Sequence, residues 1–259
     1  MYTNIYNNLY ENSNSNEHNN ENNENNENND NNSNSSIDKK YMEPTILENI
    51  NLDKYFSKED IEKSIKNNKK LMITDKGLYS ISKHMDAYWI TQNIIEFIKS
   101  KGLNTYDLNI IDGTAGIGGN TISFSKYFAK IYAIEINNVH FNVLNNNLNA
   151  LSILNVNTYF DNFLNIINDL NLKEIKSNIF FFDPPWGGKS YKNFKYFNLK
   201  IGKLSLYNII NILYEKKFKY VILKAPYNLN LSPIFNLIKY ENMSVQSNFR
   251  KNMILCIFY

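Results

Sequence analysis

The chain has 259 residues, 43% of them hydrophobic, and a formal net charge of +3, which suits one domain of roughly 200 residues plus a tail. Its single cysteine, Cys256, lies in an apolar run, which excludes a disulfide framework and a cysteine-based zinc site. No apolar run is long enough to cross a bilayer and the N-terminus lacks the apolar core of a signal peptide, so we expect a soluble, intracellular protein. We also expect a monomer that binds no metal.

The first 38 residues are dominated by Asn, Glu and Ser, and a triplet pattern runs from Glu21 to Asn32. Such a segment cannot bury enough apolar surface to offset its chain entropy, so residues 1–38 are predicted to form a disordered tail. Because this tail is acidic, the remaining chain is more basic than the total charge suggests. That balance permits a polyanionic partner.

Residues 39–100 are predicted to form a small helical extension before the main domain, which spans 101–259. Ser57 is typical of a helix N-cap, since acidic residues follow it in the first turn of a short helix. Apolar stretches on both sides of Asp75-Lys76-Gly77 indicate a hairpin. A longer helix is expected at 86–99, where apolar residues recur at helical spacing.

From residue 101 onward, strand-like apolar segments alternate with helix-like segments. This alternation predicts an α/β fold with a mainly parallel, doubly wound sheet, to which two closing strands add an antiparallel edge. The strands are expected at 108–112, 131–136, 156–160, 179–183, 220–224, 244–249 and 252–259. The helices are expected at 120–128, 139–151 (capped by Asn137 or Asn138), 163–169, 206–214 and 233–238, with a polar, aromatic loop at 189–202.

A glycine-rich turn, Asp112-Gly113-Thr114-Ala115-Gly116-Ile117-Gly118-Gly119, follows the first of these strands and opens a helix, as nucleotide-binding loops do. Its spacing is not that of a phosphate-binding P-loop, and an acid at its start suits a cofactor with a free amino group. Glu135 ends the next strand, where an acid reaches a ribose diol in dinucleotide folds. Asp161 or Asn162, after the third strand, could address an adenine amine. These strand-end acids favour S-adenosylmethionine over NAD, which the glycines alone would also permit.

The fourth strand ends at Asp183-Pro184-Pro185-Trp186-Gly187-Gly188. The prolines stiffen the backbone and cannot donate to a sheet ladder, whereas the glycines let the chain turn sharply. The result is a rigid shelf at the sheet edge where open α/β folds bind ligands. A planar base could stack on Trp186 while its amine points at Asp183 and the Pro184 carbonyl. A strand-ending turn with a core-packed Trp is the plainer alternative.

Together these stretches resemble the trimethylguanosine synthase family, the RNA cap guanine-N2 methyltransferases. The resemblance covers about 39–259, and its specific part is the combination of Gly118-Gly119-Asn120-Thr121 with Pro184-Pro185-Trp186-Gly187-Gly188. It implies a Rossmann-like class I methyltransferase fold, S-adenosylmethionine as donor, and the 7-methylguanosine cap of small nuclear and nucleolar RNAs as acceptor. The expected products are 2,7-dimethyl- and 2,2,7-trimethylguanosine caps. The expected location is the nucleus, including the nucleolus, with the cytoplasm as the alternative.

The resemblance also assigns residues to roles. Asp112 and the following glycines would contact the methionine part of the cofactor, Glu135 its ribose, and the 39–100 extension would cover the cofactor and cap. The implied cofactor contacts are Ser80, Ile81, Asp112, Gly113, Thr114, Gly116, Gly118, Asn120, Thr121, Glu135, Ile136, Asp161, Asn162 and Asp183. The implied catalytic residues are Asp183, Pro184, Pro185 and Trp186. The expected substrate contacts are Trp186, Gly187, Lys189, Tyr191, Lys224 and Asn228.

The loop at 189–196 alternates cations with aromatic rings, which suits the cap triphosphate and the first nucleotides. Packing of this loop on the core is the alternative. Two other functions also stay open at this point. An adenine-N6 or other amino-methyltransferase on RNA or DNA would use Asp-Pro-Pro-Trp equally well, although the neighbouring Gly-Gly and Asn-Thr pairs favour guanine N2. A cap-binding protein that has lost catalysis is the other, against which the intact strand-end acids argue.

Overall fold

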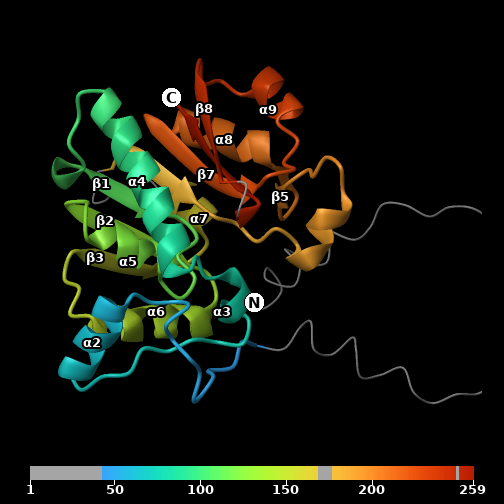
Figure 1. The fold of residues 1–259 in the computed structure, drawn as a ribbon. Helices are drawn as coiled ribbons and strands as arrows, with labels where there is room; N and C mark the ends of the chain where they lie inside the picture. Colours follow the sequence, from blue (N-terminus) through green and yellow to red (C-terminus); the bar gives the residue numbers. More distant parts are fainter. Residues whose placement is uncertain (1–42, 169–176, 249–250) are drawn as a thin grey trace, which may run out of the picture.

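A computed structural model describes residues 43–168, 177–248 and 251–259 of the chain (Figure 1). The predicted tail at 1–38 lies outside the described residues, as do Asp169 and Phe249 at the expected ends of one helix and one strand. A seven-stranded sheet runs in the order β3-β2-β1-β4-β7-β9-β8. Its pairs from β3 to β7 are parallel, and β9 pairs antiparallel with β7 and β8. The predicted mainly parallel α/β sheet with an antiparallel edge is therefore confirmed.

The elements lie close to the predicted segments. The strands of the main sheet are β1 (Asn109–Asp112), β2 (Lys130–Glu135), β3 (Val156–Phe160), β4 (Ile179–Phe182), β7 (Tyr220–Pro226), β8 (Met243–Asn248) and β9 (Met253–Phe258). The helices are α2 (Lys58–Lys66), α3 (Gly77–Ser80), α4 (His84–Ser100), α5 (Gly119–Ser125), α6 (Asn138–Ala150), α7 (Phe163–Asn168), α8 (Leu206–Glu215) and α9 (Ser232–Leu237).

Helices cover both faces of the sheet. Helices α4 and α5 pack on one face, where Ile94 and Phe124 contact Phe181 of β4, and α4 crosses the front of the sheet in Figure 1. Helices α7 and α8 pack on the other face against Phe180 and Phe182. All four residues of β4 are buried, as expected of a parallel strand covered on both faces. This burial explains why β4 is a continuous apolar run that stops at the first polar residue, Asp183.

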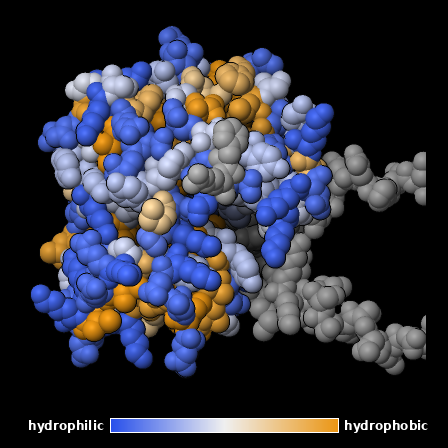
Figure 2. Space-filling model, viewed as in Figure 1, coloured by the Kyte–Doolittle hydropathy of each residue, from blue (hydrophilic) through white to orange (hydrophobic). Residues whose placement is uncertain are grey.

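The outside of the molecule is mostly hydrophilic on the face that Figure 2 shows. Separate apolar areas on that face lie near α9 and near α2 and α6. Within the described residues, no helix combines the length and the apolar character needed to cross a bilayer. Cys256 is buried in β9, within the apolar run of the sequence that contains it.

The predicted hairpin around Asp75-Lys76-Gly77 is wrong. Thr74 instead forms an isolated antiparallel bridge with Ile46, and its Oγ1 accepts a hydrogen bond from Gly77 N at 2.8 Å, at the start of α3. The stretch at 78–81 was too short for its apolar pattern to distinguish a strand from a helical turn. The loop at 189–202 also holds unpredicted structure, namely a 3-10 helix at Gly188–Asn193 and the first strand of the small hairpin of β5 (Lys200–Ile201) and β6 (Leu204–Ser205).

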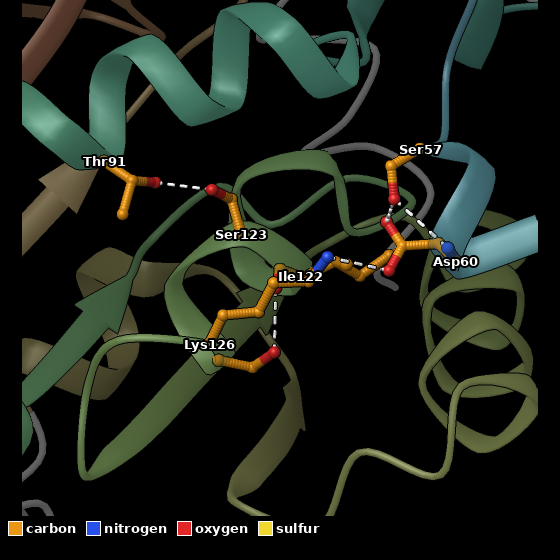
Figure 3. A network of polar contacts seen from close by, with 7 residues as sticks. Ser57, Asp60, Thr91, Ile122, Ser123 and Lys126 are labelled. Atoms are coloured by element: carbon orange, nitrogen blue, oxygen red, sulfur yellow. Dashed lines mark hydrogen bonds and ion pairs between the residues drawn. The ribbon is translucent and has the colours of Figure 1, made fainter. Parts of the chain in front are cut away.

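Two polar contacts connect the N-terminal helices to α5, the helix that begins at the glycine-rich turn (Figure 3). Lys126 Nζ pairs with Asp60 Oδ1 of α2 at 2.8 Å. Thr91 Oγ1 of α4 lies 2.6 Å from Ser123 Oγ of α5. Ser57 caps α2 as predicted, since its Oγ accepts from Asp60 N at 3.1 Å and donates to Asp60 Oδ2 at 2.7 Å. Helix α5 is thus fixed from two sides.

The cap of α2 gives a stability prediction. Ser57→Ala removes the N-cap acceptor and the partner of Asp60, and should lower the free energy of unfolding by about 1 kcal/mol in urea titrations. Ser100→Ala, which removes an exposed hydroxyl at the end of α4, is the matched control and should change stability by less than about 0.5 kcal/mol. Equal effects of the two changes would contradict the capping role.

Candidate active site

The glycine-rich turn folds around the buried carboxylate of Asp112, which accepts hydrogen bonds from Thr121 Oγ1 at 2.7 Å and Thr114 N at 3.4 Å. Gly116 has a φ of +56°, and an added Cβ there would meet nothing within 4 Å, so this part of the turn faces open space. A Cβ on Gly119 would lie 2.4 Å from the carbonyl oxygen of Ser82. The turn is therefore open on one side and closely covered by the N-terminal extension on the other.

Glu135 lies beside this turn at the end of β2. Its Oε2 accepts from Gly116 N and its Oε1 from Asn137 N, both at 2.7 Å. Burial raises the pKa of Glu135 to about 7, against the hydrogen bonds that lower it. Burial likewise raises the pKa of Asp112 to about 7, and the nearby charges of Asp183 and Glu135 add to the rise. These carboxyl groups pay a desolvation cost that a cationic ligand would offset.

Asp161 and Asn162 follow β3, as predicted, and both are half-buried. Asp161 Oδ1 accepts from Asn162 N at 2.6 Å and from Asn165 Nδ2 at 2.8 Å. Asn162 Oδ1 accepts from Leu164 N at 2.9 Å, at the start of α7. Because β1, β2 and β3 are parallel, this strand end lies at the same edge of the sheet as Asp112 and Glu135.

The carboxylate of Asp183 is paired with Lys224 of β7, a contact that sequence reasoning missed. Lys224 Nζ donates to Asp183 Oδ2 at 2.6 Å and to Ser82 Oγ at 2.9 Å, and Ser82 Oγ lies 3.3 Å from the same Oδ2. The side chains of Lys224 and Asp183 are only 10% and 9% exposed. Burial raises the pKa of Asp183, and the charge of Lys224 and hydrogen bonds from Lys224, Ser82 and Asn120 oppose that rise.

Trp186 lies next to this ion pair and is half-buried. Its ring meets Tyr191 edge-on, with centroids 5.3 Å apart and an interplanar angle of 89°. Lys224 Nζ lies 5.3 Å from the Trp186 ring centroid. The backbone N–H of Asp183 donates to Thr114 Oγ1 at 2.7 Å, which joins the shelf to the glycine-rich turn. The shelf that carries the indole therefore adjoins the turn that begins at Asp112. The indole itself is partly packed against the core, and its Nε1 is buried without a partner among the described residues.

The remaining predicted residues lie around this site with different surroundings. Asn228 is buried and its Nδ2 donates to the carbonyl groups of Tyr191 and Phe194, so it positions the loop that follows the shelf. Gly187 and Lys189 are exposed, as is Ser80, whose Oγ donates to Lys76 O at 3.3 Å. The other implied cofactor contacts are placed in the turn, at the start of α5 or beside Glu135, and are Gly113, Gly118, Asn120, Thr121 and Ile136.

Ser82 is a site residue that the sequence did not single out. The extension was expected to reach the cofactor through Ser80 and Ile81, but the buried hydroxyl in the site is that of Ser82, while Ile81 packs near Gly119. The resemblance pointed to the two residues before it, Ser80 and Ile81, and did not extend to Ser82.

The donor set fits S-adenosylmethionine. Of the three buried carboxylates, Asp112 is affected by the charges of both Glu135 and Asp183, and Lys224 is the one buried cation among the described ion pairs of the site. Asn120 Oδ1 is buried and has no partner among the described residues. A ligand carrying an ammonium and a sulfonium group supplies the missing positive charge and a donor. No group of three or more His, Cys, Asp or Glu in the described ranges could hold a metal ion.

Comparison with known proteins agrees with this geometry. A family model described as RNA cap guanine-N2 methyltransferase matches residues 108–258. An uncharacterized protein of Acanthamoeba polyphaga mimivirus is 35% identical over 187 residues, which are 66% of this chain and 72% of that protein. Trimethylguanosine synthase of Schizosaccharomyces pombe is 30% identical over 115 residues, which are 44% of this chain and 45% of that enzyme.

Two solved structures are similar at low sequence identity. One is the 16S rRNA N2 G1207 methyltransferase of Thermus thermophilus in complex with AdoMet and guanosine, with a TM-score of 0.48, 12% identity, and coverage of 66% of this chain and 42% of that one. The other is precorrin-6y C5,15-methyltransferase of Geobacter metallireducens, with a TM-score of 0.40, 16% identity, and coverage of 64% and 86%.

The raised pKa values predict how stability depends on pH. Burial raises the pKa of Asp112 and of Glu135 to about 7 in the folded protein, from ordinary values of 3.8 and 4.5. Between these ordinary values and pH 7, the folded state therefore binds more protons than the unfolded state. The cofactor-free protein should therefore lose stability as pH rises from 5 toward 8. Asp112→Asn should flatten this loss in urea titrations, whereas Glu215→Gln, at an exposed carboxylate, should leave it unchanged. An unaltered slope in Asp112→Asn would count against burial of its charge.

The close contact at Gly119 gives a second prediction. In Gly119→Ala the new methyl group must displace the Ser82 backbone, so the affinity for S-adenosylmethionine should fall by about tenfold or more, as measured by calorimetry. Ala129→Gly, at an exposed position after α5, is the control for a change of one methyl group and should keep the wild-type affinity. Normal affinity in Gly119→Ala would show that the extension does not close the cofactor site.

Proposed function

Because the chain belongs to the RNA cap guanine-N2 methyltransferase family, we propose that this S-adenosylmethionine-dependent enzyme methylates the exocyclic N2 amine of the 7-methylguanosine cap of RNA. The observation that carries the proposal is the hydrogen bond from Asp183 N to Thr114 Oγ1. It joins a shelf suited to a planar base to a turn suited to the methyl donor. Both reactants can therefore lie at one edge of the sheet.

Bound S-adenosylmethionine supplies a methyl group on a sulfonium centre; Asp112, Asn120 and Glu135 would hold it. The acceptor is an amine whose lone pair is delocalised into the purine ring, so orienting that amine is the main task of the protein. Asp183 and the Pro184 carbonyl can accept its N–H groups. As N2 gains the methyl group it loses a proton, and Asp183 can hold this proton because burial raises the pKa of its carboxyl group.

Trp186 would stack on the cap base. The 7-methyl group makes that base cationic, so stacking gains a cation–π contribution of about 1–2 kcal/mol once the base is desolvated. Tyr191 packs edge-on against the indole and keeps its plane in place. Three exposed lysines follow the shelf, and their positions support contact with the cap triphosphate; they are Lys189, Lys192 and Lys195.

The same proposal covers product, RNA and location. We infer one or two methyl transfers to N2, small nuclear and nucleolar RNAs as acceptors, and action in the nucleus. The support is the likeness of the motifs to trimethylguanosine synthases, one of which matches part of this chain. Product mass after methylation of a capped RNA distinguishes one transfer from two, and imaging of a fluorescent fusion tests the location.

Trp186→Ala tests the proposal directly. We expect a loss of at least about 100-fold in kcat/KM on 7-methylguanosine-capped RNA, with affinity for S-adenosylmethionine within about threefold of wild type, because the indole lies on the base side of the site. Trp186→Phe, which keeps a ring, should recover part of the activity. Trp89→Phe, at a half-buried indole of α4 outside the site, is the control and should keep the wild-type kcat/KM.

The same RNA with a 5′-triphosphate in place of the cap separates the remaining alternatives. Equal methylation of capped and uncapped RNA by the wild-type enzyme would favour an adenine or internal-base amino-methyltransferase. Normal cap methylation by Trp186→Ala would remove the indole from substrate binding and overturn the assignment of the shelf.

A further inference from the structure

Burying the ion pair between Lys224 and Asp183 costs desolvation free energy, because both charged groups are removed from water. Every residue of β7 is buried, and Lys224 is the one charged residue in this strand. Its neighbours in the strand pack into the hydrophobic clusters on the two faces of the sheet. A buried ion pair is often no more stabilising than well-packed apolar residues of similar volume. A lysine at this position therefore suggests a function beyond stability, and its surroundings indicate which one.

The ammonium of Lys224 has one proton left for a ligand. Lysine carries three N–H donors, and Nζ of Lys224 has two hydrogen-bond partners among the described residues, Asp183 Oδ2 and Ser82 Oγ. Nζ also lies 5.3 Å from the centre of the Trp186 ring. A donor and an acceptor thus stand side by side next to the indole on which the base would stack.

This arrangement matches one edge of guanine. Guanine presents an acceptor, O6, in line with two donors, N1–H and the N2 amine. A carboxylate can accept from the donors while a neighbouring ammonium donates to O6. Adenine presents an amine at the position of O6, so an ammonium there would face another donor, and a buried unpaired donor costs free energy. The pair is complementary to guanine and opposed to adenine.

Charge balance is consistent with this arrangement. A lone lysine beside a cationic 7-methylguanine would repel it, but the bond to Asp183 at 2.6 Å neutralises the ammonium. The hydroxyl of Ser82 fixes the same ammonium from the N-terminal extension, so its direction is set by two partners on different segments.

We propose that Lys224 determines base specificity by donating a hydrogen bond to O6 of the cap guanine while Asp183 accepts from N1–H and N2–H. This inference rests on the proposed function, since it assumes that a purine stacks on Trp186. It gives Lys224 a defined role at the base, where the sequence had indicated only a contact with the cap.

The test compares two cap dinucleotides. One carries 7-methylguanine; the other carries 7-methyl-2,6-diaminopurine, which keeps the N2 amine, replaces O6 with an amine and has no hydrogen on N1, so it tests the contacts of Lys224 and Asp183 together in the wild-type enzyme. The wild-type enzyme should prefer guanine by about 10- to 100-fold in Kd and in kcat/KM, the range expected of a hydrogen bond to a charged group. Lys224→Met, of similar length but without a donor, should reduce this preference by about tenfold, while the part that comes from N1–H and Asp183 should remain.

Two further variants keep the result interpretable. Asp183→Asn/Lys224→Met removes the unpaired buried carboxylate that Lys224→Met alone would leave, and should show the same loss of preference even if the single variant folds poorly. Lys189→Met, at an exposed lysine beside the shelf, should weaken binding of both ligands equally and keep the wild-type ratio between them. The ratio is the quantity compared in every variant.

A positioning role for Lys224 would give a different result. If the lysine only orients Asp183, both analogues should lose activity equally in Lys224→Met and the preference for O6 should persist, which overturns the inference. Kd values from calorimetry measure base recognition by Lys224 separately from methyl transfer to N2, so the two proposals can fail independently. A wild-type enzyme that binds guanine in preference to diaminopurine but transfers no methyl group to N2 would overturn the proposed function and support the role of Lys224.

Discussion

The structure depends on the burial of negative charge at the carboxyl edge of a parallel sheet. Asp112, Glu135 and Asp183 end three neighbouring strands, and burial raises the pKa of each. Side-chain and backbone donors, such as Thr121 for Asp112 and the backbone amide of Gly116 for Glu135, offset only part of the desolvation cost. A cationic ligand would offset part of the remaining cost.

The N-terminal extension forms one wall of this site. Ser82 places its carbonyl oxygen against Gly119, and its hydroxyl accepts a hydrogen bond from Lys224, the partner of Asp183. The segment before α4 therefore contacts both the glycine-rich turn and the ion pair at the shelf. Helix α4 itself belongs to the main core, where Ile94 packs with Phe124. Closure of the site is therefore linked to the packing of α4 and α5, and the contact between Thr91 and Ser123 lies on that path.

Most of the fold was predictable because its signals are local. The strand runs, the Ser57 cap and the Asn137 cap can each be recognised within a few residues, and the Asn137 side chain does accept from His140 N. The turn at 75–77 was mispredicted because a short apolar stretch fits a strand or a helical turn. The ion pair of Asp183 with Lys224 joins residues that are far apart in the sequence. It follows from the register of β4 and β7: Phe182 pairs with Leu223, so the residues that follow them, Asp183 and Lys224, lie side by side. Only the strand order would have revealed it.

The charges of the site also indicate what becomes of the proton. With its carboxylates ionised, the site carries two more negative than positive charges, counting Lys224. Under the proposed function, a methyl donor with one net positive charge and a cationic 7-methylguanine would together bring it to neutrality. Methyl transfer would then remove one positive charge from the donor, while the base would keep its own charge after N2 loses a proton. If that proton stays on Asp183, neutrality is preserved until the products leave. A carboxyl group whose pKa is raised by burial, and kept from rising further by one lysine, is suited to hold the proton for that interval and then release it.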